Sequence, residues 1–214
     1  MKSFNNEPAL KVAEFLLQIK AVKLQPNAPF TWASGWKSPI YCDNRKTLSY
    51  PKVRTFIRQQ FVQSILEKFG KPDVIAGVAT GGIAHGVLVA EEMGLPFVYI
   101  RSEAKKHGLT NMIEGVIESG QSVVVIEDLI STGGSSLKAV EALRAAGCEV
   151  KGMAAIFTYG FQAALDEFKK SKCEVITLCD YQTLIKQALL SSFISEKELK
   201  SLEIWREDPS NWPK

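Results

Sequence analysis

Two adjacent carboxylates, Glu127 and Asp128, stand shortly before a run of hydroxyl and glycine residues. The run consists of Ser131, Thr132, Gly133, Gly134 and Ser135. Backbone N–H groups and hydroxyls in such a loop suit an anion such as phosphate. Carboxylates repel a phosphate, so the same ligand must also offer them hydroxyl groups or a bound cation. A sugar phosphate does both, and the spacing predicts a site for one.

The flanking segments predict a strand before these residues and a helix after them. Residues 123–126 are four consecutive β-branched apolar residues, typical of a strand buried in a parallel sheet, and we expect it to end at the carboxylates. Residues 137–146 have apolar residues at helical spacing, and Gly147 follows as a C-cap. The Walker pattern and Gly-x-Gly-x-x-Gly are both absent from the sequence. An ordinary nucleoside-triphosphate or dinucleotide site is therefore disfavoured.

Residues 123–135, Val-Val-Val-Ile-Glu-Asp-Leu-Ile-Ser-Thr-Gly-Gly-Ser, resemble the phosphoribosyl pyrophosphate (PRPP) motif of type I phosphoribosyltransferases. The resemblance implies an α/β fold with a central, mostly parallel sheet flanked by helices. It also implies that residues 1–214 form a single domain, whose small hood comes mainly from residues 1–50. The alternative is a buried strand, an acidic turn and an N-capped helix, pieces that any α/β protein can contain. The implied PRPP contacts are Arg101, Lys105, His107, Glu127, Asp128, Leu129, Ile130, Ser131, Thr132, Gly133, Gly134 and Ser135.

Aromatic residues alternate around Ser-Gly and Ser-Pro in residues 30–45, which predicts two short strands joined by a turn. This order resembles the hood of orotate phosphoribosyltransferases and implies that orotate is the base. The chain has Gly160 where an arginine often touches orotate, so Arg45, Lys37 or backbone groups are left as candidates for its carboxylate. An exposed hairpin with core aromatic residues is the alternative. The implied orotate contacts are Ser131, Ser38, Tyr41 and Arg45.

A second glycine-rich loop, Thr80, Gly81 and Gly82, follows a strand predicted over residues 72–78. Glycines let backbone N–H groups approach phosphate oxygens closely. In the family that the chain resembles, a loop here holds the pyrophosphate. A simple turn that binds nothing is the alternative.

Residues 101–108, Arg-Ser-Glu-Ala-Lys-Lys-His-Gly, begin a polar stretch of about a dozen residues with almost no apolar periodicity. Arg101, Lys105, His107 and Gly108 match the mobile catalytic loop of orotate phosphoribosyltransferases. The resemblance implies a homodimer with shared active sites, in which Lys105 and His107 reach into the neighbouring site. It gives Lys105, His107 and Asp128 as catalytic residues. A solvated charged loop is the alternative.

The implied reaction is transfer of the 5-phosphoribosyl group from PRPP to orotate in pyrimidine biosynthesis, which releases pyrophosphate. Mg²⁺ is the expected cofactor, held mainly through PRPP rather than by ligands of the protein. Two other functions compete: a phosphoribosyltransferase for another base, and a PRPP-sensing regulator that binds nucleic acid. A regulator needs a DNA-binding domain or a broad basic face, and the sequence indicates neither.

The 214 residues carry a formal net charge of only +3, which by itself implies no nucleic-acid partner. The four cysteines have no C-x-x-C spacing, the N-terminus lacks a signal pattern, and no apolar run approaches the length of a membrane span. We therefore expect a soluble, cytoplasmic protein with no membrane partner.

Apolar spacing in the rest of the chain predicts alternating helices and strands, as in a parallel sheet covered on both faces. From Ser195 the spacing of Leu199, Leu202, Ile204 and Trp205 predicts a docking helix. The other predicted helices cover residues 8–23, 51–69, 83–93, 160–170 and 181–190, and the other strands cover 97–100, 150–159 and 174–178.

Overall fold

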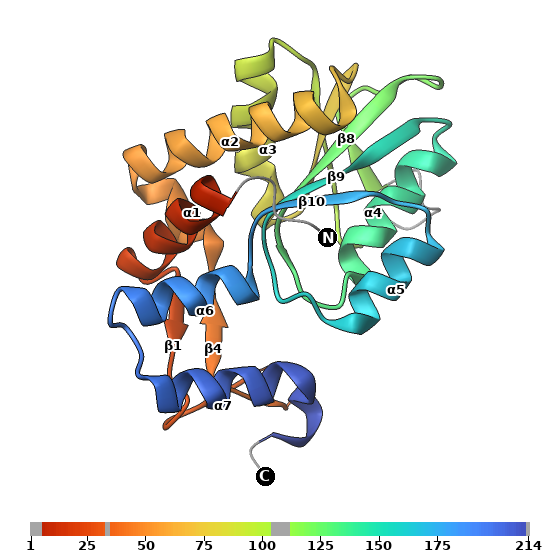
Figure 1. The fold of residues 1–214 in the computed structure, drawn as a ribbon. Helices are drawn as coiled ribbons and strands as arrows, with labels where there is room; N and C mark the ends of the chain where they lie inside the picture. Colours follow the sequence, from red (N-terminus) through yellow and green to blue (C-terminus); the bar gives the residue numbers. More distant parts are fainter. Residues whose placement is uncertain (1–5, 33–34, 104–111, 213–214) are drawn as a thin grey trace.

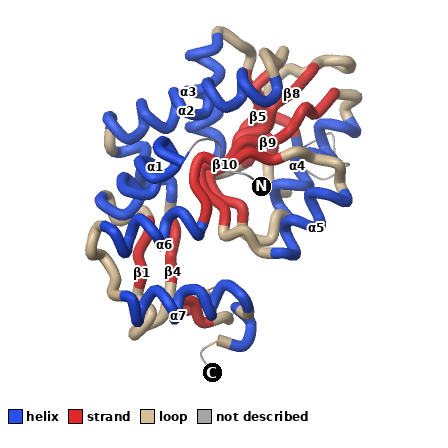
Figure 2. Tube along the Cα trace, in the orientation of Figure 1, coloured by secondary structure: helices blue, strands red, loops and turns tan. Residues whose placement is uncertain are grey.

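A six-stranded sheet forms the centre of the computed structural model, which describes residues 6–32, 35–103 and 112–212 (Figures 1 and 2). Five strands are parallel, and β7 pairs antiparallel with β6 at one edge. This confirms the central, mostly parallel sheet that was predicted from the sequence. In spatial order the strands are β10 (Val175–Asp180), β9 (Glu149–Thr158), β8 (Ser122–Ile130), β5 (Val74–Val78), β6 (Phe97–Ile100) and β7 (Ile113–Glu114).

Helices cover both faces of this sheet, because alternate strand residues point to opposite sides. Val124 and Ile126 pack in one core cluster with α1 (Asn6–Gln18), α2 (Pro51–Phe69), α3 (Gly81–Met93) and α6 (Tyr181–Leu190). Val123 and Val125 pack in the other cluster with α4 (Gly134–Ala145) and α5 (Gln162–Lys170). The apolar run of residues 123–126 is thus buried on both sides, as the sequence predicts.

The two glycine-rich loops meet between β5 and β8. From this point the strand order runs toward β6 on one side and toward β9 on the other. Strands β5 and β8 are parallel neighbours, and α3 follows β5 on one face while α4 follows β8 on the other. Carboxyl ends of adjacent parallel strands leave a crevice at such a switch point, and ligands of open α/β sheets bind there.

A smaller lobe, the hood lobe, lies beside the sheet at the lower end of the molecule (Figure 1). It joins N-terminal and C-terminal segments, and all four of its strands lie within residues 1–50, from which the sequence predicted that the hood mainly comes. Strand β1 (Val22–Leu24) pairs antiparallel with β4 (Ile40–Cys42), and β2 (Phe30–Thr31) pairs with β3 (Lys37–Ser38). The remaining elements are the 3-10 helices η1 (Asn44–Ser49) and η3 (Pro209–Asn211) and the helix α7 (Glu196–Glu207).

Helix α7 docks as the sequence predicts. Ser195 caps it in a reciprocal capping box with Glu198. Leu202 and Trp205 are fully buried, while Ile204 faces solvent at 55% exposure. The indole Nε1 of Trp205 donates to the carbonyl of Lys37 at 3.2 Å, so the C-terminal helix holds the β2–β3 hairpin.

Several predicted boundaries are wrong for identifiable reasons. The first helix ends at Gln18, not at residue 23, because Lys20 adopts a positive φ of 55° and Val22 starts β1. Strand β8 runs past both carboxylates to Ile130, since its ladder with β9 continues to the pair Ile130 and Thr158. Helices α3 and α4 begin on glycines of the loops, at Gly81 and Gly134. Within the described residues, no helix is both long and apolar enough to cross a membrane.

Candidate active site

A polar cleft of about 360 Å³ opens at the switch point. The ends of β5 and β8 and the start of η1 form its walls, so it joins the sheet to the hood lobe. Thr80 and Gly81 lie on one side of it, and Arg45 comes from the hood lobe. Its lining residues are Cys42, Asp43, Arg45, Ala79, Thr80, Gly81, Glu127, Asp128, Leu129 and Ser135.

Glu127 is held inside the protein, with only 5% of its surface exposed. Its carboxyl oxygens accept hydrogen bonds from the Ser136 hydroxyl at 2.9 Å and from the backbone N–H of Asp128 at 3.0 Å. Burial, followed by the neighbouring Asp128 charge, raises the pKa of Glu127 to about 8. Burial therefore favours the protonated form of Glu127, which reduces the negative charge of the pair.

Asp128 is the carboxylate that the cleft presents. Burial raises its pKa as well, while the Glu127 carboxyl and the Arg45 charge pull that pKa down. A side chain at Gly81 would overlap the Asp128 carboxyl group, so only glycine permits the two loops to approach this closely. Gly82 is packed directly against the carbonyl of Ile126, which brings the start of α3 onto β8.

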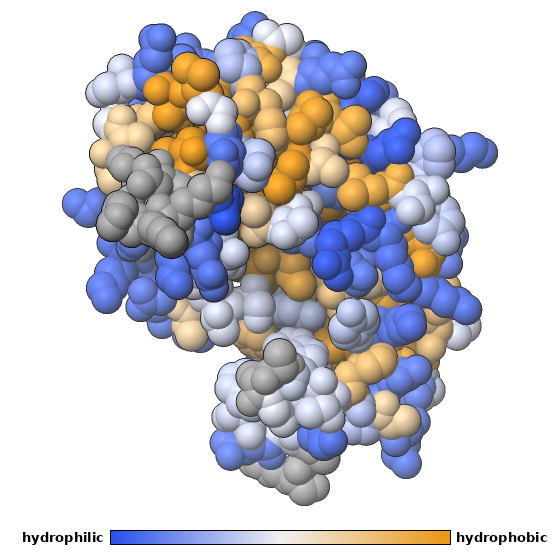
Figure 3. Space-filling model, turned by 180° about the vertical axis from the view of Figure 1, so that it is seen from behind, coloured by the Kyte–Doolittle hydropathy of each residue, from blue (hydrophilic) through white to orange (hydrophobic). Residues whose placement is uncertain are grey.

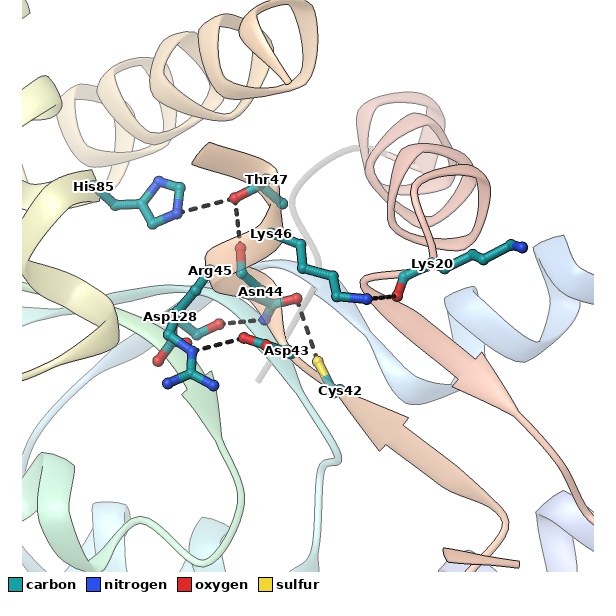
Figure 4. A network of polar contacts seen from close by, with 9 residues as sticks. All are labelled: Lys20, Cys42, Asp43, Asn44, Arg45, Lys46, Thr47, His85 and Asp128. Atoms are coloured by element: carbon teal, nitrogen blue, oxygen red, sulfur yellow. Dashed lines mark hydrogen bonds and ion pairs between the residues drawn. The ribbon is translucent and has the colours of Figure 1, made fainter. Parts of the chain in front are cut away.

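A buried network ties η1 to the Asp128 backbone (Figure 4). The Asn44 amide donates to the carbonyl of Asp128 at 2.6 Å, and the Thr47 hydroxyl donates to the carbonyl of Asn44 at 2.6 Å. The hydroxyl has one proton, so Nε2 of His85 must donate to Thr47 at 3.1 Å. Burial lowers the pKa of His85 to about 4, so the ring is neutral at pH 7. The network fixes the peptide that carries Asp128.

An apolar pocket of about 540 Å³ adjoins the polar cleft and shares Cys42 and Leu129 with it. Seen from behind, the molecule is hollowed between its larger body and the hood lobe, with hydrophobic side chains on the floor (Figure 3). Aromatic rings are the faces on which a flat heterocycle stacks, so the pocket suits a planar base. Its lining residues are Thr31, Trp32, Trp36, Tyr41, Cys42, Leu129, Ser131, Thr132 and Tyr159.

Residues 131–133 connect β8 to α4 beside the polar cleft and the apolar pocket. Gly133 is the N-cap of α4 with φ of 85°, and no side chain caps the helix there. Thr132 and Ser135 are exposed. Uncapped N–H groups at a helix start, together with the helix dipole, favour a negatively charged group nearby.

The chain matches the family model of the phosphoribosyl transferase domain over residues 49–187. It is 60% identical to the orotate phosphoribosyltransferase of Phocaeicola vulgatus over 200 residues, 94% of each chain. The enzyme of the same name from Listeria monocytogenes serotype 4b is 55% identical over 204 residues, 95% of this chain and 98% of that one. The chain belongs to the orotate phosphoribosyltransferase family. It is a transferase that adds a phosphoribosyl group to orotate in pyrimidine synthesis, and the predicted activity is confirmed.

Solved structures carry the same fold. The orotate phosphoribosyltransferase of Aeropyrum pernix superposes with a TM-score of 0.75 at 24% identity, covering 86% of this chain and 99% of that one. The structure of Leishmania donovani UMP synthase superposes with a TM-score of 0.79 at 27% identity, covering 93% of this chain and 42% of that longer one.

Some residues predicted for this orotate phosphoribosyltransferase site lie elsewhere. Ile130 is wholly buried, and its carbonyl accepts a hydrogen bond from the backbone N–H of Tyr159. Ser38 is also wholly buried, with its hydroxyl donating to the carbonyl of Ile40, and it shapes the turn before β4. Arg101 lines neither hollow and forms an ion pair with Glu114 at 3.4 Å. Lys105, His107 and Gly108 lie outside the described residues.

The structure also adds residues that sequence reasoning missed. Trp32, Trp36 and Tyr159 line the apolar pocket, and the aromatic alternation of residues 30–41 was the available signal for the two tryptophans. Asn44 and His85 support Asp128 through contacts distant in sequence, and nothing local in the sequence marks them.

Proposed function

We propose that the polar cleft binds the ribose and diphosphate of PRPP and that the apolar pocket binds orotate. The observation that carries this division is that the two hollows adjoin at the end of β8, where Leu129 and Cys42 line both. The reacting C1 of the ribose then lies at their junction, with the leaving group on the polar side and the base on the aromatic side. This is the separation that an in-line displacement needs.

The 5-phosphate is assigned to residues 131–135 and the start of α4. Uncapped N–H groups and the exposed hydroxyls of Thr132 and Ser135 support this assignment. Binding energy from this remote group orients the ribose in the cleft. Tyr41 and Ser131 are the proposed orotate contacts, since both line the apolar pocket.

Displacement of diphosphate passes through a state in which positive charge develops on the ribose. Asp128 accepts hydrogen bonds from the ribose hydroxyls and stabilises that charge, because its carboxylate faces the cleft beside the second glycine loop. Glu127 supports it from within: its bond from Ser136 fixes the carboxyl, and its proton leaves the pair with a single negative charge. No protein nucleophile is needed.

The proposed cofactor is Mg²⁺. Among the residues that the structure describes, no group of three or more His, Cys, Asp or Glu side chains is arranged to hold a metal ion. The oxygen-rich cleft beside Asp128 fits a hard cation that arrives with PRPP and keeps most of its ligands from it. When bound, Mg²⁺ neutralises part of the diphosphate charge.

A shared active site in a cytoplasmic homodimer completes the proposal. In the family's pattern Arg101, Lys105 and His107 serve the diphosphate, the latter two from the neighbouring subunit. The ion pair of Arg101 with Glu114 holds Arg101 at the end of β6, which is the neighbour of β5 in the sheet.

The first experiment is to follow loss of orotate absorbance on adding PRPP and Mg²⁺. Uracil, hypoxanthine and adenine are assayed beside it for pyrophosphate release. We expect turnover of orotate alone. Turnover of another base would overturn the assignment of the apolar pocket, and PRPP binding without any turnover would favour a PRPP-sensing regulator.

The shared site is tested by mixing two inactive variants, Lys105→Ala and Asp128→Asn. If Lys105 acts in the neighbouring subunit, each mixed dimer has one site with both native residues, and activity returns to a fraction of wild type. Differently tagged subunits verify that mixed dimers have formed. Verified mixed dimers without activity would refute the shared site.

A further inference from the structure

The polar cleft holds an unequal set of charges. Its lining includes three carboxyl groups, on Asp43, Glu127 and Asp128, and among its described lining residues Arg45 is the one cation. Even with Glu127 protonated, the remaining carboxylates oppose an anionic ligand. Mg²⁺ neutralises only part of the diphosphate charge, so a protein cation that faces the cleft adds to the binding of this ligand. The position of Arg45 is therefore important for anion binding, although its side chain is 58% exposed.

Arg45 is held in place through one of its nitrogens. Its Nε donates to Oδ1 of Asp43 at 2.7 Å, and this contact is the largest cause that lowers the pKa of Asp43. The guanidinium projects from η1 toward Asp128 (Figure 4). Within the described residues its two terminal nitrogens make no hydrogen bond, so they remain for a ligand. A guanidinium fixed in this way offers a fork of N–H groups to phosphate oxygens.

The neighbouring cation points elsewhere. Lys46 lies in the same 3-10 helix, but its ammonium group donates to the carbonyl of Lys20 at 3.1 Å, on the opposite side of η1 (Figure 4). Lys46 lines neither hollow. Comparing variants of Arg45 and Lys46 therefore distinguishes the loss of a positive charge in the cleft from the loss of a positive charge elsewhere in the hood lobe.

We propose that Arg45 binds the diphosphate of PRPP and that Asp43 is its positioning residue. This inference rests on the proposed function, which puts the diphosphate in the polar cleft. It changes the prediction from sequence, in which Arg45 was a candidate for the orotate carboxylate. Arg45 lines the cleft with Thr80 and Gly81 and is absent from the lining of the apolar pocket.

The position also gives Arg45 a part in the reaction. As the bond between C1 and the diphosphate oxygen breaks, its electron pair goes to that oxygen, while a ring nitrogen of orotate forms the new bond to C1 and its N–H proton passes to water. Negative charge grows on the leaving group, and the guanidinium stabilises it more strongly than it stabilises bound PRPP. Arg45 therefore contributes to turnover as well as to binding.

The test compares Arg45→Gln with Lys46→Gln. Calorimetric titrations in Mg²⁺ use PRPP, inorganic pyrophosphate and ribose 5-phosphate, and steady-state kinetics give KM for orotate. We expect Arg45→Gln to weaken PRPP and pyrophosphate roughly tenfold or more, the effect of losing a charge-assisted hydrogen bond. Ribose 5-phosphate affinity and KM for orotate stay within about twofold. Lys46→Gln changes none of these, and equal thermal unfolding of both variants excludes a folding defect.

Two further variants test the geometry. Arg45→Lys keeps the charge without the fork and should lose less affinity for pyrophosphate than Arg45→Gln. Asp43→Asn removes the tether of Arg45 together with a carboxylate that opposes the diphosphate, so a loss of pyrophosphate affinity in this variant shows that the tether outweighs the repulsion. A rise in KM for orotate with unchanged pyrophosphate affinity would overturn the inference, as would unchanged values throughout. Failure of the wild-type protein to bind PRPP would instead refute the proposed function.

Discussion

The polar cleft and the apolar pocket meet at one strand end but are built by different parts of the chain. Loops at the carboxyl ends of β5 and β8 provide most of the polar cleft, so Gly81, Glu127 and Asp128 are fixed by the sheet. The hood lobe supplies most of the aromatic wall of the pocket, through Trp32, Trp36 and Tyr41. In the proposed division, PRPP is bound mainly by groups on the sheet and the base mainly by groups on the hood lobe.

Different buried contacts hold the walls of the polar cleft and of the apolar pocket. Asn44 and Glu127 support the polar cleft by hydrogen bonds. The apolar pocket is supported by aromatic packing around Trp205, whose ring lies 5.6 Å from that of Trp32 and 5.9 Å from that of Tyr159. Breaking one support should affect one hollow more than the other, and this difference can be measured.

The largest effect is expected from Trp205→Ala. The indole is wholly buried among four aromatic rings, and truncating such a residue costs about 3–5 kcal/mol of folding free energy. Loss of the bond to Lys37 also loosens the β2–β3 hairpin, so KM for orotate should rise more than KM for PRPP. Urea unfolding and steady-state kinetics measure the two effects.

Ile204→Ala is the matched control for that change. The residue is adjacent in α7 and 55% exposed, so its truncation should stay within about 0.5 kcal/mol. If Trp205→Ala raised both KM values equally, α7 would not support the pocket selectively.

Asp128→Asn should have the next largest effect, on turnover rather than on stability. The amide keeps the shape of the side chain but removes the charge that opposes the growing positive charge on the ribose. We expect kcat to fall roughly 10²- to 10³-fold, about 3–4 kcal/mol. Asp166→Asn, on the exposed face of α5, is the control and should stay near wild type. Full activity in Asp128→Asn would exclude its proposed role.

These two residues differ in how far the sequence could predict them. Asp128 follows an apolar run and precedes a glycine loop, so local pattern alone places it near the carboxyl end of a strand and before a helix N-terminus, although β8 continues to Ile130. Trp205 is 168 residues from its hydrogen-bond partner Lys37 in the chain. Apolar spacing predicts that it is buried, but only the tertiary fold determines which rings surround it.

The same reason explains why the internal arrangement of the hood lobe could not be predicted from the sequence. Its strands have two or three residues each, too short for a periodic pattern, and their pairing depends on contacts such as that of Val22 with Cys42. The Asn44 bond to Asp128 spans 84 positions of the chain, so sequence alone could not link them. The sheet was predictable because its strands are apolar runs between glycine-rich turns.

A smaller effect is expected in the pH dependence of stability. Because the pKa of Glu127 is raised from 4.5 to about 8 in the folded protein, the folded state binds the proton more tightly than the unfolded state. Its contribution is complete below pH 4.5 and is lost as the pH rises toward 8, by at most about 1.4 kcal/mol per pH unit. Glu127→Gln should flatten this decline, and Glu141→Gln on exposed α4 should leave it unchanged. Denaturant unfolding from pH 5 to 8 measures it; an unaltered slope in Glu127→Gln would contradict the buried proton.

The smallest effect is expected from Ser38→Ala, which tests whether Ser38 contacts orotate. The hydroxyl donates to the carbonyl of Ile40 at 2.8 Å and also accepts from its backbone N–H at 3.2 Å, so its loss should cost about 1 kcal/mol of folding free energy. KM for orotate should remain unchanged, because the side chain is wholly buried outside the apolar pocket. Tyr41→Ala, which removes a pocket-lining ring, should raise that KM. An increase in KM for orotate in Ser38→Ala without loss of stability would return Ser38 to the orotate contacts that the sequence predicted.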